Sequence, residues 1–237
     1  MRGVRLLVAV VATSVIATAA AAQGPDYHGK ATVAAYEAAG EPSVDVNVRY
    51  GAGDWTGWVG YYGGSDQDHQ GRAGIEYDLH RRAIYVVPSA QIASHGFVGG
   101  SAYAEIGSTV YLIGGVSRTN LHPYANLTFD PNESWQIGAG WHIGQRDSLA
   151  GYTIWDNRLH TGQQITHLVL KRYLPGARRL TFDTSYKSGH GDNDVYVRGV
   201  AESVEYDWRR WFVKGAVDEH ANYGPATMVR AGGGLRF

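Results

Sequence analysis

The chain lacks cysteine altogether and carries almost no net charge. Its 237 residues include 21 basic and 22 acidic side chains, which gives a formal charge of −1. Without cysteine the protein cannot be a disulfide-stapled domain, hold a thiolate metal site or use a cysteine nucleophile. The balanced charge argues against a polybasic nucleic-acid binder, so nucleic acid is not an expected partner.

Long hydrophobic runs are also missing beyond the N-terminus. Residues 1–22 have the pattern of a secretory signal peptide, with Arg2 and Arg5 before an apolar stretch and small residues at its end. The stretch is shorter than the ~20 apolar residues of a membrane-spanning helix and contains hydroxyl side chains. Later windows show neither an apolar run of that length nor a sustained helical stripe. We therefore expect an exported protein without helical membrane spans.

Glycine and large aromatic residues are abundant instead. The sequence contains 32 Gly, 16 Tyr and 7 Trp, whereas only 18% of its residues are charged. Glycine at about twice its usual ~7% share disfavours helix interiors. This composition favours a β protein that is rich in aromatic side chains.

Apolar and polar residues alternate in segments of about ten residues, which is the pattern of antiparallel strands. In residues 227–237 the odd positions are mostly apolar, whereas the even positions from Arg230 onward carry arginine or glycine. Similar alternation occurs in residues 44–50, 72–79, 135–143, 180–187 and 211–218. Between Val195 and Trp208 the apolar parity changes, and a β-bulge near Glu202 would reconcile its two halves.

Alternation alone fits either a periplasmic or secreted β-sandwich or a transmembrane β-barrel. Glycine-rich polar faces and a C-terminal Phe237 behind alternating apolar residues favour the barrel. Aromatic residues near segment ends fit the interfacial girdles of such a barrel: Trp55, Trp58, Tyr61, Tyr62, Trp135, Trp208 and Trp211. We predict an all-β fold, a single antiparallel transmembrane β-barrel of about 12–14 strands in the Gram-negative outer membrane.

The predicted domain organisation is simple. Residues 1–22 are the signal peptide, residues 23–42 a short periplasmic lead and residues 43–237 the barrel. Both ends of such a barrel are periplasmic, so alternation assigns residues 175–178 and 207–210 to periplasmic turns. Outer loops are expected at residues 157–163, 188–194 and 218–225. Leu235 and Phe237 form the predicted terminal assembly signal.

The second half of the chain resembles the YaiO-like outer-membrane β-barrel family. The likeness rests on Leu170–Leu174 with the Pro-Gly turn after it, Leu180–Tyr186, Val204–Tyr206, and the terminal Gly233, Leu235, Arg236 and Phe237. The resemblance implies an outer-membrane barrel from a family in which some members are associated with surface polysaccharide systems. The helical-repeat segment that precedes the barrel in longer members has no counterpart here.

The polar faces place charged side chains inside the predicted barrel. This inward set has five acids and seven bases: Asp45, Glu76, Asp78, Asp183 and Asp218, with Arg49, Arg72, Lys171, Lys187, Lys214, Arg230 and Arg236. A wide ion-selective pore more often has rings of one sign. The mixed set favours cross-strand pairs in a mostly filled lumen, with a narrow, slightly cation-repelling passage as the alternative.

Histidine and carboxylate residues recur in the predicted outer loops. His160, His190 and His220 fall in the last three loops, and Asp192 lies beside His190. Imidazole and carboxylate groups could bind a divalent metal or a sugar phosphate there. No spacing fixes two ligands on one element, so solvated loop residues are the simpler interpretation, and we assign no metal site.

Catalytic motifs are weak. The sequence has no G-x-S-x-G motif, and Ser188 with His190 is the better of two weak serine and histidine pairs. Neither glycine cluster leads into a helix that could hold a phosphate, so no cofactor is expected. We predict a non-enzymatic passage or surface component, with a barrel enzyme that hydrolyses or transfers acyl chains of lipid A or phospholipid as the alternative. Expected partners are outer-membrane lipid, lipopolysaccharide, the barrel-assembly machinery and, from the resemblance alone, polysaccharide.

Overall fold

The computed structural model of the chain describes residues 27–64, 69–122, 124, 130–158, 161–191 and 194–237. These residues form antiparallel strands and two short 3-10 turns, η1 (Ser94–Gly96) and η2 (Ala221–Tyr223). None of the described helices is long and apolar enough to cross a membrane. The strands are β1 (Gly29–Ala38), β2 (Glu41–Ala52), β3 (Trp55–Gly64), β4 (His69–Tyr77), β5 (Leu79–Arg81), β6 (Ile84–Ala93), β7 (Phe97–Gly107), β8 (Val110–Thr119), β9 (Ser134–Ile143), β10 (Asp147–Asp156), β11 (Gln164–Leu174), β12 (Arg178–His190), β13 (Tyr196–Trp208), β14 (Trp211–Asp218) and β15 (Met228–Arg236).

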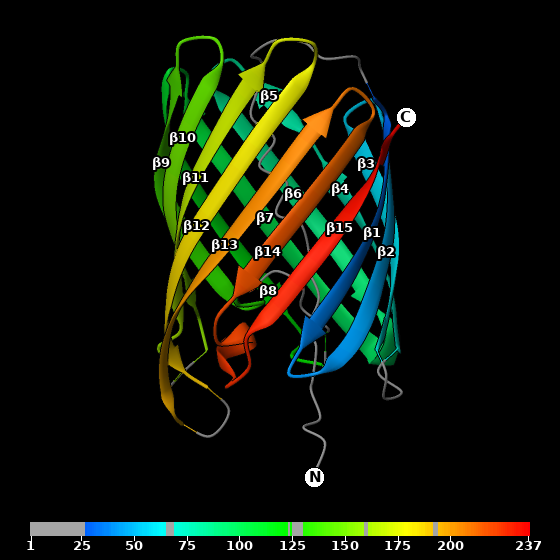
Figure 1. Cartoon of the computed structure of the whole chain (residues 1–237). Helices are drawn as coiled ribbons and strands as arrows, with labels where there is room; N and C mark the ends of the chain where they lie inside the picture. Colours follow the sequence, from blue (N-terminus) through cyan, green and yellow to red (C-terminus); the bar gives the residue numbers. More distant parts are fainter. Residues whose placement is uncertain (1–26, 65–68, 123, 125–129, 159–160, 192–193) are drawn as a thin grey trace.

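Strand pairing closes the sheet into a barrel (Figure 1). Nearly every strand pairs with its neighbours in the sequence. The strands β4 and β5 are separated only at Asp78 and both pair with β6, so together they act as one spanning strand. The first and last strands complete the circle, with Lys30 opposite Arg236 and Ala38 opposite Met228. The predicted all-β barrel is confirmed, as a closed antiparallel barrel of 14 spanning strands.

The start of the barrel differs from the sequence prediction. Residues 23–42 were expected to form a periplasmic lead, but Gly29–Ala38 form β1 and Glu41 begins β2. Alanine occupies positions on both faces of β1, so the strand has little apolar alternation. Its place is fixed by main-chain pairing with β2 and β15, which a weak sequence pattern does not reveal. The proposed signal peptide, residues 1–22, lies outside the described residues.

The two ends of the barrel differ. At one end, which we call the short-turn end, the strands are joined by residues 53–54, 82–83, 108–109, 144–146, 175–177 and 209–210. Phe237 lies at the same end, at the top of Figure 1. The connections β8–β9, β10–β11, β12–β13 and β14–β15 are longer and lie at the opposite, long-loop end. This separation matches the turns and loops expected from alternation, although β12 reaches His190 and β13 reaches Trp208.

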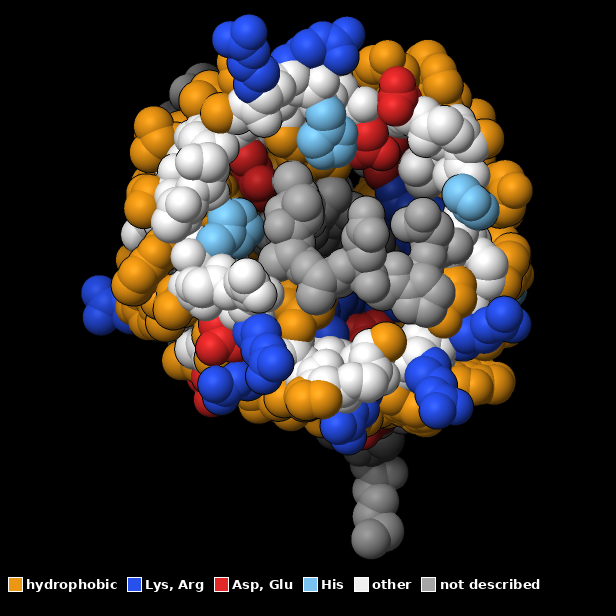
Figure 2. Space-filling view, turned by 90° about the horizontal axis from the view of Figure 1, so that it is seen from above, with side chains coloured by type: hydrophobic (Ala, Val, Ile, Leu, Met, Phe, Trp, Pro, Cys, Tyr) orange, Lys and Arg blue, Asp and Glu red, His pale blue; other side chains and the backbone are white. Residues whose placement is uncertain are grey.

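The outer surface is apolar. Viewed from the short-turn end, hydrophobic side chains surround the barrel wall (Figure 2). Val59, Ile137 and Leu112 are more than half exposed on this surface. Trp55 and Trp211 lie at strand ends near the short turns, and Trp135 stacks on Trp155 near the long loops, with ring centroids 4.3 Å apart. Such a band, bounded by aromatic residues, suits contact with a lipid bilayer.

Two residues expected in the aromatic girdles lie inside the barrel. Trp58 lines an internal cavity, and Tyr62 packs in a buried cluster with Tyr36. The Trp58 ring occupies the space beside Gly74, where an added Cβ would lie 2.5 Å from the ring. Aromatic side chains occupy both faces of β3, so alternation did not separate the inward from the outward ones.

The β-bulge predicted near Glu202 is another correction. Strand β13 pairs with β12 without interruption from Tyr196 to Trp208. Val197 and Ala201 are buried toward the interior, whereas Val204 is exposed on the outside. The change of parity therefore reflects apolar residues inside the barrel near the long loops and requires no extra residue in the strand.

Part of the interior is an apolar core. Seven buried side chains on β8, β10 and β11 form this cluster: Tyr111, Ile113, Ala150, Tyr152, Ile154, Ile165 and Val169. Gly140 leaves room for the Tyr111 ring, since an added Cβ would lie 2.1 Å from it. The cluster fills the space beside these strands.

Candidate functional site

The candidate site begins with two ion pairs on neighbouring strands. Arg72 on β4 pairs with Asp45 on β2, and Arg49 on β2 pairs with Glu76 on β4. Both arginines reach across β3, where Gly60 lies between Asn47 and Arg72 in the register. An added Cβ at Gly60 would lie 3.1 Å from Arg72 Nε. A residue without a side chain at this position therefore lets the arginine cross the strand.

Two lysines contribute charge near these pairs. Lys30 on β1 and Lys214 on β14 line the same cavity as Arg49 and Arg72. Lys30 Nζ lies 4.3 Å from the centroid of the Phe212 ring. Within the part of the chain that the structure describes, neither lysine has a carboxylate within ion-pair distance. Glu205 lies near both ammonium groups without forming an ion pair with either.

A four-residue cluster explains why Glu205 does not pair with Lys214, although the two are register partners. Arg179 Nη2 lies 2.8 Å from Asp207 Oδ2 and 3.2 Å from Glu205 Oε1. Arg236 contacts the same two carboxylates, and its Nη2 lies 3.4 Å from Glu205 Oε1. Both acids are therefore shared between two guanidinium groups, one from the neighbouring strand β12 and one from β15, which lies beyond β14. The cluster is neutral and joins β12, β13 and β15.

A second neutral pair is completely buried. Lys187 on β12 and Asp218 on β14 form an ion pair in which both side chains are 0% exposed. Lys187 Nζ also donates to the main-chain oxygen of His220, 3.4 Å away, and lies near the Tyr223 ring. The Tyr223 hydroxyl donates to Gln164 O at 3.0 Å, and burial raises its pKa, so it remains a donor. This pair supports the long-loop end of the barrel.

Two described residues of the β8–β9 connection, Tyr124 and Asp130, line the cavity inside the barrel. Asp130 accepts a contact from His167 Nε2 on β11 at 3.1 Å, while His167 Nδ1 lies 3.0 Å from Asp183 on β12. His167 stacks on Tyr152, with ring centroids 4.9 Å apart. Tyr124, from the same connection, stacks on Phe97 at 4.2 Å and lines the cavity. His167 therefore links Asp130 of this connection to β11 and β12.

The two ion pairs of β2 and β4, the two lysines, Tyr124 and Asp130 line a cavity of about 280 Å³. Its charged lining comes from β1, β2, β4 and β14, together with Asp130. Neutral polar side chains line it from strands β6 to β9, including Gln91, Ser101, Ser117 and Gln136. The cavity therefore joins a charged wall to a wall of hydroxyl and amide groups, and each can hydrogen bond to a polar solute.

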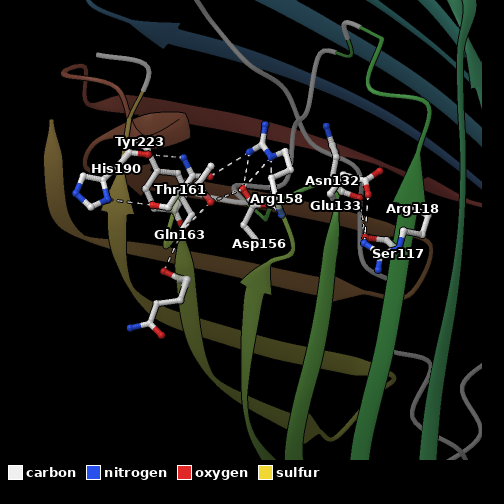
Figure 3. A network of polar contacts seen from close by, with 11 residues as sticks. Ser117, Arg118, Asn132, Glu133, Asp156, Arg158, Thr161, Gln163, His190 and Tyr223 are labelled. Carbon is white, nitrogen blue, oxygen red and sulfur yellow. Dashed lines mark hydrogen bonds and ion pairs between the residues drawn. The ribbon is translucent and has the colours of Figure 1, made fainter. Parts of the chain in front are cut away.

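Polar contacts also order the long-loop end (Figure 3). Arg158 pairs with Asp156 at 2.7 Å, and the Thr161 hydroxyl donates to the same carboxylate at 2.9 Å. The Gln163 amide donates to His190 O at 2.7 Å, which links the β10–β11 connection to β12. On the neighbouring strands the Ser117 hydroxyl donates to Asn132 O at 2.7 Å.

Two of the four predicted outer-loop candidates, His190 and His220, lie among the described residues. His190 Nδ1 lies 3.3 Å from Thr161 O, and His220 Nδ1 lies 2.9 Å from Gly224 O. Each imidazole therefore contacts a main-chain carbonyl. His160 and Asp192 lie outside the described residues. The described part of the chain also contains no group of three or more metal-ligating side chains that could hold an ion.

The charged residues that alternation predicts inside the barrel have the following positions in the structure. Asp45, Arg49, Arg72, Glu76, Asp183, Lys187, Asp218 and Arg236 form the pairs described above. Asp78 accepts a hydrogen bond from the Tyr85 hydroxyl at 2.6 Å. Lys171 and Arg230 are buried on inward positions of β11 and β15, and Lys214 lines the cavity.

Among the described residues, the sequence reasoning missed several charged interior residues, including Lys30, Glu105, Asp130, Arg179, Glu205 and Asp207. Arg179, Glu205 and Asp207 follow the odd parity of the inward positions on β12 and β13, so alternation could have identified them. Lys30 was hidden in the segment assigned to the lead. Asp130 carries no local signal, because its position depends on a contact with His167, 37 residues away in the chain.

The terminal residues lie at the seam of the barrel. Leu235 is the register partner of Ala31 on β1 and of Trp211 on β14. Phe237 N donates to Gly29 O at 2.9 Å, and Gly29 N donates to Phe237 O at 2.6 Å. The Phe237 ring covers Gly29, where an added Cβ would lie 2.3 Å from the ring. The last residue is therefore fixed to the first strand.

The enzyme alternative gains no support from the geometry. Ser188 is buried, and its Oγ accepts a hydrogen bond from Gln164 Nε2 at 3.2 Å. His190 Nδ1 contacts Thr161 O and not this hydroxyl. A nucleophilic serine requires a base within hydrogen-bond distance. The geometry of Ser188 and His190 does not provide this arrangement.

No protein-family model and no curated protein matches the sequence. Solved structures do match. The outer membrane protein Omp33 of Acinetobacter baumannii is similar with a TM-score of 0.63 and 12% identity, over 91% of this chain and 100% of that one. The KdgM porin has a TM-score of 0.50 and 8% identity, over 88% and 99%. A substituted Rh. blastica porin gives the same TM-score, identity and coverage.

These identities establish likeness of fold alone. The closed barrel, its apolar exterior and its outer-membrane neighbours agree with the predicted location in the Gram-negative outer membrane. The chain has the fold of outer-membrane β-barrel proteins, porins among them.

Proposed function

We propose that the chain forms a passage for small polar solutes across the outer membrane, without catalysing a reaction. The observation that carries this proposal is the internal cavity of about 280 Å³, lined by charged, hydroxyl and amide groups. A polar interior within an apolar exterior gives a water-soluble molecule a favourable environment while it crosses a bilayer. The similarity of the fold to that of porins supports the same interpretation.

Planar-bilayer recordings test the proposal directly. The folded protein is expected to give stepwise conductance. Ser101→Trp adds a large side chain to the cavity and should reduce the unit conductance. Ile92→Trp is the matched control, because Ile92 is 59% exposed on the exterior of the neighbouring strand β6. Folding of each variant is checked by heat-modifiable gel mobility, and insertion of folded wild-type protein without conductance would contradict the proposal.

We further propose, from the sequence resemblance, that the barrel is YaiO-like and serves an envelope polysaccharide system. The resemblance is carried by the strand segments around Leu170–Leu174 and Leu180–Tyr186 together with the terminal residues. Comparison of surface polysaccharide from cells with and without the gene tests this role. Equal amounts and equal chain lengths would remove the polysaccharide from the proposal and leave the passage unaffected.

We also infer that the barrel-assembly machinery inserts the chain among outer-membrane lipid and lipopolysaccharide. The C-terminal Phe237 and the outward Leu235 support this inference, because they follow an alternating apolar strand. Phe237→Ala should reduce the amount of heat-modifiable barrel in the outer membrane of cells, whereas purified protein should still refold in detergent. Equal amounts of assembled barrel for the wild type and for Phe237→Ala in cells would contradict an assembly role for Phe237.

A further inference from the structure

We propose that the cavity binds and passes small anions in preference to cations, through the ammonium groups of Lys30 and Lys214. This inference rests on the proposed passage and specifies the class of solute. The expected solute is a small anion, either a halide or an oxyanion that accepts hydrogen bonds through its oxygen atoms.

The described lining of the cavity contains four basic and three acidic side chains: Lys30, Arg49, Arg72 and Lys214, with Asp45, Glu76 and Asp130. Asp45 and Glu76 are each bound by an arginine that also lines the cavity. These two pairs contribute no net charge. Asp130 is held by His167, which it shares with Asp183. The carboxylates of the lining are therefore already engaged.

Lys30 and Lys214 differ from the arginines. Across the described residues, neither forms an ion pair, since Glu205, the register partner of Lys214, is bound by Arg179 and Arg236. The charged groups near Lys214 include Arg230 and Lys30 as well as Glu205 and Asp45. Glu205 and Asp207 also lie near Lys30, but Arg179 and Arg236 already balance these two carboxylates, so the lysines leave this group of charges positive. Excess positive charge in a protein interior is costly, and a bound anion would offset it.

The two lysines can be reached from the cavity. Both side chains line it, so a solute inside can approach their ammonium groups. Gly232 on β15 is the register partner of both Lys214 on β14 and Ala34 on β1. A Cβ at Gly232 would lie 2.8 Å from the Ala34 Cβ, so the strands approach closely here and only a residue without a side chain fits between them.

The other wall completes a site for an anion. Gln91, Ser101, Ser117 and Gln136 line the cavity and carry hydroxyl or amide groups that can donate hydrogen bonds. A cation would instead meet the net positive charge of this wall, with the lining carboxylates already bound to other side chains. Selectivity for one sign requires such an unbalanced field inside the passage.

Selectivity is measured from the reversal potential of single channels in a gradient of potassium chloride. The wild-type protein is expected to pass chloride in preference to potassium. The double variant Lys30→Gln, Lys214→Gln should lower the ratio of anion to cation permeability by about twofold or more, since it removes both charges. Lys171→Gln is the matched control, because Lys171 is buried in the interior but does not line the cavity. Its permeability ratio should equal that of the wild type.

Binding is measured separately from conductance by the fluorescence of Trp58, which lines the cavity. Titration with inorganic phosphate at constant ionic strength should change the emission in a saturable manner. The change should vanish in Trp58→Phe, and the double lysine variant should bind phosphate about tenfold more weakly. Heat-modifiable gel mobility is required of every variant.

The outcomes separate the two proposals. Conductance with a preference for potassium, or with a permeability ratio that the lysine substitutions leave unchanged, overturns the anion inference and retains the passage. Saturable phosphate binding that requires both lysines, in a folded protein without conductance, overturns the passage and retains the anion site. The absence of both conductance and phosphate binding overturns both proposals.

Discussion

At the scale of single residues, the buried ion pair of Lys187 and Asp218 is expected to contribute to the stability of the barrel. Both side chains are 0% exposed. Lys187→Met should lower the free energy of unfolding by about 3–5 kcal/mol, because it leaves a buried carboxylate without its counter-charge. The measurement is urea-induced unfolding of the barrel in lipid vesicles.

Two comparisons make that result specific. The double variant Lys187→Met, Asp218→Leu removes both charges and should recover most of the lost stability. Arg172→Met removes one partner of an exposed pair with Asp147, in which the arginine side chain is 61% exposed. That substitution should cost about 0–1 kcal/mol. Equal losses for Lys187→Met and Arg172→Met would show that burial does not determine the effect.

Gly74 provides a second prediction at this scale. An added Cβ at Gly74 would lie 2.5 Å from the Trp58 ring, so Gly74→Ala should destabilise the barrel by about 1–3 kcal/mol through overpacking. Gly57→Ala is the control. Gly57 precedes Trp58 on β3 and faces outward, and an added Cβ there meets nothing within 4 Å. The same unfolding measurement applies, and no loss in Gly74→Ala would mean that Trp58 moves freely.

At the scale of elements, His167 is one of the contacts that hold the described part of the β8–β9 connection, together with the stacking of Tyr124 on Phe97. His167→Phe keeps an aromatic ring that can stack on Tyr152 but removes the contacts with Asp130 and Asp183. Hydrogen exchange of the amides of Asp130, Asn132 and Glu133 should become about tenfold faster, since a hydrogen bond to a charged group contributes ~1.5 kcal/mol or more. Unchanged exchange would mean that other contacts hold this connection.

A neighbouring residue on the opposite face of the same strand is the control for that experiment. Thr166 faces outward and shares a hydrogen bond with Thr153, 2.9 Å away. Thr166→Val removes this bond but leaves the contacts inside the barrel unchanged. The exchange rates of the same amides in Thr166→Val should equal those of the wild type. Any acceleration in His167→Phe can then be assigned to the lost contacts of His167 with Asp130 and Asp183.

The elements differ in how well their sequences predict them. Strands β2, β14 and β15 separate apolar from polar residues clearly. Their two faces follow from alternation because the side toward lipid favours apolar residues and the side toward the lumen favours polar ones. Strand β1 was missed because alanine fits both faces equally well. On β3 the inward Trp58 is accommodated by Gly74 of the next strand, and only the cross-strand register reveals that vacancy.

At the scale of the whole molecule, closure of the barrel requires β1. A chain that comprises residues 39–237 lacks the partner of β15 and should not give a monomer with heat-modifiable mobility after refolding in detergent. A chain that comprises residues 23–237 should give one. Equal mobility shifts in both chains would mean that the barrel closes without β1.

The candidate site was predictable only in part. Alternation identified Arg49, Arg72 and Lys214 as inward residues, because each lies on a strand with a clear polar face. The partner of each charge was not predictable, since Glu205 binds Arg179 and Arg236 and leaves its register partner Lys214 without an acid. Asp130 enters the site from a connection, and its position is determined by His167 rather than by neighbouring sequence.

The seam between β1 and β15 also sets the order of assembly. Pairings within the rest of the barrel join segments that follow one another closely, so hairpins can form as soon as their two strands are available. The seam joins residues from opposite ends of the chain and bears the largest loop-closure entropy. We expect it to form last, after β15 has been synthesised, and until then both open edges need protection from pairing with other chains.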